Sequence, residues 1–136
     1  MIVLDANAAI AIALGTTDGT ALEMLQDPGE LIIAPALLHS EVAHAMVKYV
    51  RGGYLETDQT LAVARDAVAL VDEYRDDALL MTEAMTESIR LEHSSYDLFY
   101  LILARREGAT LFTLDRRLQE LCENNGVSTL WVNGEF

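Results

Sequence analysis

Short apolar runs alternate along the chain with longer stretches in which apolar residues recur every three or four positions. Continuous apolar runs bounded by turn residues predict buried strands at residues 1–5, 30–34, 78–81, 109–114 and 127–132. The recurring apolar positions predict helices at residues 7–14, 18–26, 36–51, 57–75, 82–91, 95–107 and 115–124. Strands that alternate with helices predict an α/β fold with three α/β/α layers around a central parallel sheet of four or five strands.

Residues with strong cap preferences lie next to most of the predicted helices. Hydroxyl side chains suited to the N-cap precede or open four of them, at Thr17, Thr57, Thr82 and Ser94. Asp97 follows Ser94 by three positions, as in a capping box. Glycines that favour the end of a helix stand at Gly15, Gly52 and Gly108. These signals agree with the helix boundaries that the apolar pattern predicts.

Length and composition narrow the class of protein. The 136 residues, 51% of them hydrophobic, suit a single domain over residues 1–136 with one core. No apolar run is long enough to span a membrane, and the N-terminus lacks the basic region of a signal peptide. The single cysteine, Cys122, has no partner for an internal disulfide, which fits a reducing cytoplasm. We therefore expect a cytoplasmic protein without a membrane segment.

Four acidic residues lie in or directly after apolar segments that are far apart in the sequence. Asp5 ends the first predicted strand, and Asp115 follows the strand-like run at residues 109–114. Glu41 lies on the inward side of its predicted helix, and Asp97 begins a very apolar helix. In parallel α/β sheets, ligands bind beyond the carboxyl ends of the strands. We therefore expect the four carboxylates to converge at that edge of the sheet.

A cluster of carboxylates predicts a bound cation. Burying one ionised carboxylate is costly, and several together raise one another's pKa unless a positive charge intervenes. Oxygen ligands suit a hard divalent cation such as Mg²⁺ or Mn²⁺, and such a site supports phosphoryl-transfer chemistry. Each acid also has a structural explanation that stays open. Asp5 and Asp115 are placed to cap helices, Asp97 lies in a first helical turn, and Glu41 lies at the border of an apolar stripe.

Several other polar and aromatic residues are candidates for a role beside these acids. The hydroxyl of Thr113 is placed to bind a metal-bound water or a phosphate, and Arg116 is placed to contact a phosphate. The three histidines lack a convincing metal-ligand spacing and are interpreted as surface or boundary residues: His39, His44 and His93. The aromatic residues of the apolar helix are predicted to be core or dimer contacts: Tyr96, Phe99 and Tyr100.

The charge of the chain is unusual for a protein that binds nucleic acid. The formal net charge is −13, and Lys48 is the only lysine. A nucleic-acid binder usually has a basic surface, so this composition argues against tight, sequence-independent binding to phosphates. It does not exclude a nuclease, because a metal-loaded acidic cleft meets its substrate through cations. An acidic surface also suits a basic protein partner.

Several segments resemble the PIN domain family. They are LDAN at residues 4–7, SEVAHAM at 40–46, SYDLFYLILARREGATLFTLD at 95–115 and the closing strand. More narrowly, they resemble the VapC-like toxin ribonucleases of VapBC toxin–antitoxin modules, over essentially the whole chain. The resemblance implies that the catalytic, metal-binding acids are Asp5, Glu41, Asp97 and Asp115. It also aligns Thr113 with a small hydroxyl residue of the family, and Asn7 with a position where many relatives carry Thr or Ser.

This resemblance implies a function and a set of partners. Family members typically cleave RNA with Mg²⁺ or Mn²⁺, usually dimerise, and are covered at the active cleft by the tail of an antitoxin. We therefore expect a metal-dependent endoribonuclease that hydrolyses RNA phosphodiester bonds, as the toxin of a type II toxin–antitoxin module. The expected partners are an RNA substrate, a cognate antitoxin and a second copy of the chain.

Two other functions were considered. The first is a catalytically inactive PIN-like module that only binds a protein partner, although the presence of all four acids speaks against lost catalysis. The second is a phosphatase of the haloacid-dehalogenase type, which also carries an acid after its first strand. That class needs a second Asp two residues later, where this chain has Asn7.

Overall fold

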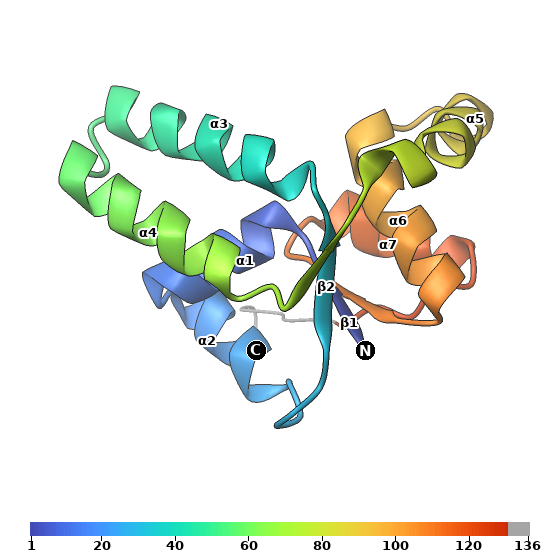
Figure 1. Ribbon diagram of the computed structural model, residues 1–136, viewed down its shortest axis with the longest axis horizontal. Helices are drawn as coiled ribbons and strands as arrows, with labels where there is room; N and C mark the ends of the chain where they lie inside the picture. The colour runs from blue at the N-terminus through green and yellow to red at the C-terminus, as the bar shows by residue number, and fades with distance from the viewer. Residues whose placement is uncertain (131–136) are drawn as a thin grey trace.

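The computed structural model describes residues 1–130, and within them a parallel sheet forms the centre of the molecule (Figure 1). Its strands are β1 (Ile2–Leu4), β2 (Ile32–Pro35), β3 (Glu73–Arg75) and β4 (Thr110–Phe112), in the spatial order β3-β2-β1-β4. All pairings are parallel, and β1 lies between β2 and β4, with Val3 opposite Ile33 and Leu111. The α/β fold with a parallel sheet is confirmed.

Helices cover both faces of this sheet. Figure 1 shows α1 to α4 on one side of the strands and α5 to α7 on the other. Their bounds are α1 (Ala6–Leu14), α2 (Thr17–Met24), α3 (Leu38–Arg51), α4 (Thr57–Ala69), α5 (Met81–Leu91), α6 (Ser95–Glu107) and α7 (Arg116–Asn124). A short 3-10 helix, η1 (Asp77–Leu79), precedes α5. Within the described residues, no helix combines the length and apolar character needed to cross a bilayer.

The core has two halves, one on each face of the sheet. Side chains alternate along a strand, so Ile2 and Leu4 pack with α1, α3 and α4, while Val3 packs with α6 and α7. Helix α6 contributes the continuous buried segment from Tyr100 to Ala104 to this core. Burying one large apolar side chain contributes roughly 1.5–3 kcal/mol. This packing holds the first turn of α6, with Asp97, at the carboxyl edge of the sheet.

The third strand lies elsewhere than the apolar pattern predicts. Residues 78–81 were expected to form it, but they belong to η1 and the start of α5. The strand is instead β3, whose Glu73 pairs with Ile33 of β2. Helix α4 consequently ends at Ala69 rather than near residue 75. An edge strand is solvated on one side, so β3 is polar and gives no continuous apolar run.

Three helices begin with N-cap residues other than the predicted ones. Helix α2 is capped by Thr16, which accepts the Gly19 N–H at 3.0 Å, rather than by Thr17. Helix α4 is capped by Glu56, in a capping box with Gln59, rather than by Thr57. Helix α5 begins at Met81 and has no side-chain cap, which places Thr82 inside it. In α2 and α4 the N-cap lies one residue before the predicted one.

The last predicted strand is only partly within the described residues. Thr129 forms an isolated parallel bridge with Leu111, and the Leu111 N–H donates to the Ser128 carbonyl at 2.8 Å. The predicted strand at residues 127–132 therefore begins beside β4, while residues 131 and 132 lie outside the described part of the chain.

Helices α1 and α2 approach each other closely at Gly19. A Cβ at this position would lie 2.1 Å from the carbonyl oxygen of Ala11, which is closer than any real contact. We expect Gly19→Ala to destabilise the fold by roughly 1–3 kcal/mol, because α2 must move away from α1. Urea unfolding measures this, with exposed Thr20→Ala on the same helix as the control. Equal stability of the two variants would contradict the close approach.

Candidate functional site

A pocket of about 270 Å³ opens at the carboxyl ends of β1 and β4. All four acids singled out in the sequence line it, and they come from four different segments. The complete lining is Asp5, Ala6, Asn7, Ile10, Glu41, Ala45, Tyr49, Asp97, Tyr100 and Asp115. We call this the acidic pocket. The expected convergence of the four carboxyl side chains is therefore present, although their chemical role stays a prediction.

Asp5 lies deepest, with 5% of its surface exposed. It ends β1 and is the N-cap of α1, where its Oδ1 accepts the Ala8 N–H at 3.0 Å. Its Oδ2 accepts the hydroxyl of Thr113. The pKa of Asp5 is raised to about 8, chiefly by burial and to a smaller extent by the charges of Asp97 and Glu41, against the lowering effect of the two hydrogen bonds.

Thr113 and Asn7 connect the segments that follow β1 and β4. The Thr113 side chain is fully buried, and its Oγ1 donates to Asp5 while accepting the Asp115 N–H at 3.0 Å. In this structure the hydroxyl orients Asp5 and Asp115, and its binding of a metal-bound water or a phosphate stays a prediction. Asn7 Oδ1 accepts the Leu114 N–H at 3.1 Å, which connects the segment after β1 to the segment after β4.

Glu41 is held by a tyrosine from the opposite side of the pocket. The Tyr100 hydroxyl donates to Glu41 Oε1 at 2.6 Å. Burial raises the pKa of Glu41, and the charge of Asp97 adds to this, while the Tyr100 hydrogen bond lowers it. Tyr100 is buried, as predicted for a core residue, but its contact with Glu41 was not anticipated. Its position one helical turn after Asp97 was the available signal.

Asp97 lies in the first turn of α6 and is held by a histidine. His93 Nε2 lies 2.7 Å from Asp97 Oδ2, and only 9% of the His93 side chain is exposed. Burial raises the pKa of Asp97, the His93 hydrogen bond lowers it, the Asp115 charge raises it and the Arg117 charge lowers it. Ser94 is the N-cap residue of α6, but its side chain makes no cap hydrogen bond.

His93 was interpreted as an ordinary boundary residue, and that interpretation missed its contact with Asp97. The four-residue spacing between the two was the only sequence signal. The loop before α6 fixes the ring, since the His93 carbonyl accepts the Ser88 hydroxyl and Glu92 adopts a left-handed backbone with φ of 52°. A carboxylate oriented by a histidine in this way keeps a defined direction.

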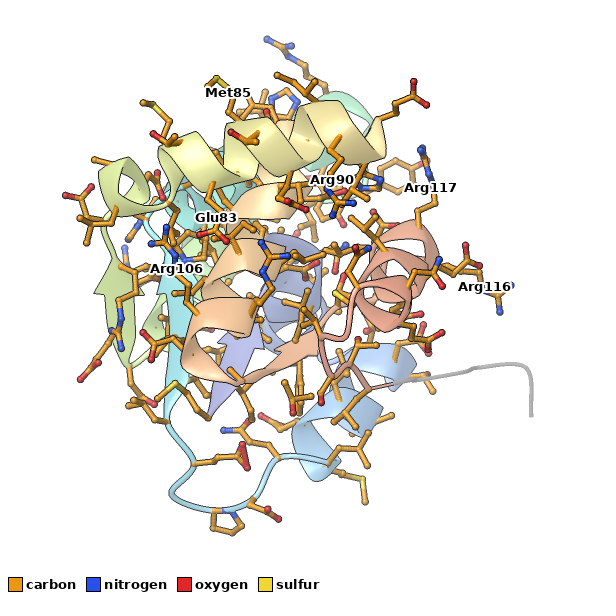
Figure 2. All side chains as sticks on the ribbon, turned by 90° about the vertical axis from the view of Figure 1, so that its right-hand side faces the viewer. Glu83, Met85, Arg90, Arg106, Arg116 and Arg117 are labelled. Atoms are coloured by element: carbon orange, nitrogen blue, oxygen red, sulfur yellow. The ribbon has the colours of Figure 1, made fainter. Side chains whose placement is uncertain are left out.

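Asp115 caps α7 directly after β4. Its Oδ1 accepts the N–H groups of Arg117 at 2.9 Å and Leu118 at 3.4 Å. The structural explanation of Asp5 and Asp115 as helix caps is therefore correct, and both caps also face the acidic pocket. Arg116 is exposed and extends outward from α7 (Figure 2), whereas its neighbour Arg117 lines a small pocket that also contains Asp97 and Asp115.

The chemistry of the donors fits a hard divalent cation. Each of three acids keeps one oxygen without a hydrogen bond to the described part of the chain: Glu41 Oε2, Asp97 Oδ1 and Asp115 Oδ2. Burial is the main cause of the raised pKa values of Asp5, Glu41 and Asp97, and the neighbouring carboxylates of the pocket raise them as well. Within residues 1–130, no three His, Cys, Asp or Glu side chains already form a metal-binding group. Binding therefore requires these side chains to move closer together.

The fold is similar to those of two solved structures. PAE2754 from Pyrobaculum aerophilum is 20% identical, with a TM-score of 0.71 over 94% of this chain and 82% of that one. VapC20 from Mycobacterium tuberculosis, a toxin that cleaves the sarcin-ricin loop, is 17% identical, with a TM-score of 0.62 over 89% of this chain and 95% of that one. At these identities the likeness concerns the fold alone.

Sequence comparison identifies the family directly. No curated protein matches the chain. The model of the PIN domain family, in contrast, matches residues 2–124, a range that contains β1 to β4 and all four acids of the pocket. Because this match covers nearly the whole sequence, the chain belongs to the PIN domain family.

Proposed function

We propose that this protein is a metal-dependent ribonuclease that hydrolyses RNA phosphodiester bonds with Mg²⁺ or Mn²⁺. The observation that carries the proposal is the convergence of Asp5, Glu41, Asp97 and Asp115 on one pocket in a PIN domain chain. We further propose that it is the toxin of a type II toxin–antitoxin module. The similar fold of VapC20, a toxin that cleaves the sarcin-ricin loop, supports this part of the proposal.

The four carboxylates would hold the cation, and the residues around them set their direction. When bound, a divalent cation stabilises charge on the phosphate and lowers the pKa of a coordinated water. Thr113 holds Asp5, Tyr100 holds Glu41, and His93 holds Asp97. The Tyr100 and His93 contacts each occupy one oxygen of the carboxylate and leave the other oxygen for a ligand.

A carboxylate of the pocket accepts the proton of the attacking water in this scheme. Glu41 and Asp97 are the candidates, because each combines an oxygen that has no hydrogen-bond partner in the described part of the chain with a raised pKa. Burial raises the pKa of both groups, which makes them better proton acceptors than an exposed carboxylate. The leaving group is the 3′-oxygen of the cleaved phosphodiester, a polarity inferred from the family.

Removal of the metal tests the proposed chemistry. We expect EDTA to reduce cleavage of single-stranded RNA to background, and excess Mn²⁺ to restore it, because the proposed scheme needs the charge of the cation. Calorimetry should detect Mn²⁺ binding to the folded, metal-free protein. Cleavage that persists in EDTA would point to contamination or to a different mechanism. A folded protein that binds no Mn²⁺ would instead support the inactive interaction module.

A protein partner and a second copy of the chain belong to the same proposal. Helix α5 carries an exposed apolar row with a spacing of four residues, formed by Met81, Met85 and Ile89. Figure 2 shows Met85 on the outer face of this helix. Such a row on a surface helix supports a protein interface, as a homodimer or with a cognate antitoxin. The expected location is the cytoplasm, where the RNA substrate is found.

The phosphatase alternative gains no support from the site. A haloacid-dehalogenase enzyme needs a second Asp two residues after the first, and Asn7 occupies that position. The Asn7 side chain is engaged in a hydrogen bond to the Leu114 N–H. Release of phosphate from small phosphomonoesters would be required to revive this alternative.

A further inference from the structure

Two further pockets adjoin the acidic pocket on different sides. One, of about 480 Å³, shares Glu41 and Ala45 with it and is also lined by Lys48 and Tyr96. The other, of about 120 Å³, shares Asp97 and Asp115 with it and is also lined by Arg117. We call them the Lys48 pocket and the Arg117 pocket. The three pockets therefore form a continuous series, with the acids in the middle.

The two outer pockets each contain a cation that is not neutralised by an ion pair. Several arginines elsewhere are bonded to glutamates, namely Arg75, Arg90, Arg105 and Arg106. Neither Lys48 nor Arg117 forms an ion pair with any residue in the described part of the chain. Figure 2 shows Arg116 and Arg117 leaving the first turn of α7 in different directions. Arg117 acts electrostatically on Asp97 without a direct ion pair. In a protein of net charge −13, Lys48 and Arg117 therefore place positive charge beside the acidic pocket, where phosphate groups are attracted.

An exposed aromatic ring completes the Lys48 pocket. Tyr96 lies one residue before Asp97 and is 61% exposed, so of the two predicted roles, core or dimer contact, the core role does not apply. Ser40 and His44 of α3 line the same pocket and add polar side chains. Single-stranded nucleic acids bind to grooves that combine cations for the backbone with aromatic rings on which bases stack. The Lys48 pocket has both components.

We propose that the three pockets form the track of a single RNA strand through the site. This inference rests on the proposed function and specifies how the substrate lies. Lys48 binds a phosphate on one side of the cleaved bond, Tyr96 stacks on a base beside it, and Arg117 binds a phosphate on the other side. The track explains how an acidic chain retains an anionic substrate: the cations stand on both sides of the carboxylates.

Binding of RNA by single-residue variants tests the track. The background is Asp97→Asn, in which cleavage is expected to be lost, and the measurement is fluorescence anisotropy of a labelled single-stranded RNA with MnCl₂. We expect Lys48→Gln and Arg117→Gln each to raise the Kd by about 3–10-fold. Each should also reduce the dependence of log Kd on log salt by about 0.7, the value for one phosphate contact on a single strand. Tyr96→Ala should raise the Kd about tenfold without changing the salt dependence.

Arg65→Gln is the matched control, because it removes the same charge from an exposed position on α4 outside the three pockets. An equal effect of Arg65→Gln and Lys48→Gln would overturn the track while leaving the ribonuclease proposal intact. Two results together would overturn both the track and the ribonuclease proposal: folded Asp97→Asn binds Mn²⁺ but no RNA, and the wild type cleaves no RNA. RNA binding that survives the pocket substitutions, while binding of an acidic peptide is lost, would assign the track to a protein partner and overturn the inference.

Discussion

Asp97→Asn is expected to reduce metal-dependent RNA cleavage by at least about 1000-fold while preserving the fold. The substitution removes one negative ligand, and loss of several kcal/mol of transition-state stabilisation corresponds to about this factor. Asparagine has nearly the same size, and its side chain still offers a hydrogen-bond partner to His93 Nε2, which lies 2.7 Å from Asp97 in the wild type. Initial rates on a fluorescent RNA measure the loss, and calorimetry should show weakened Mn²⁺ binding.

A matched control separates the loss of a ligand from the loss of a charge. Asp66→Asn makes the same chemical change at an exposed position of α4. Asp66 does not line the acidic pocket. Its cleavage rate is expected to equal that of the wild type. Circular dichroism melting curves should be similar for all three proteins. Undiminished cleavage by folded Asp97→Asn would refute the assignment of the site.

Asp5→Asn is expected to stabilise the metal-free protein at alkaline pH. The pKa of Asp5 is raised from 3.8 to about 8 in the fold, chiefly by burial. Between these values the folded protein retains a proton that the unfolded chain releases, so the free energy of unfolding falls as the pH rises from about 4 to about 8. Asparagine cannot ionise, so the free energy of unfolding of the variant lacks this decrease. One pKa unit corresponds to about 1.4 kcal/mol, so the gain at pH 8 is on the order of 2–5 kcal/mol.

Urea unfolding in EDTA at several pH values measures this effect. The difference in stability between variant and wild type should grow as the pH rises. This difference reports the ionisation of Asp5, because Glu41 and Asp97 are present in both proteins. Added Mg²⁺ should stabilise the wild type more than the variant, since a ligand that binds only the folded state shifts the equilibrium toward it. A variant less stable than the wild type at alkaline pH without metal would contradict the buried, metal-dependent role of Asp5.

The apolar pattern predicted most of the architecture because burial controls it. The runs at residues 1–5 and 109–114 contain β1 and β4, and the run at residues 30–34 overlaps all of β2 except Pro35. The apolar segment at residues 95–107 matches α6 residue for residue. The convergence of Asp5 and Asp115 followed from strand topology, because adjacent parallel strands end at the same edge.

Solvated positions were predicted less well because their local preferences compete with tertiary contacts. Strand β3 is polar, so it was assigned to the predicted helix that precedes it. Thr57 was expected to cap α4, but Glu56 and Gln59 form the cap. The metal, the RNA substrate, the antitoxin and the dimer stay predictions, as does the catalytic role of each acid.

The sequence by itself determined the family, the parallel α/β architecture and the acids that end up at one edge of the sheet. The architecture follows from hydrophobic periodicity and from the alternation of strands with helices, whereas the family follows from the sequence motifs and the match over residues 2–124. Only the tertiary structure decided how each acid is held. Thr113 is 108 residues from Asp5 and Tyr100 is 59 residues from Glu41, so these contacts depend on how helices pack across the sheet. The same packing placed Lys48 and Arg117 on different sides of the acidic pocket, because side-chain direction is set by helix orientation.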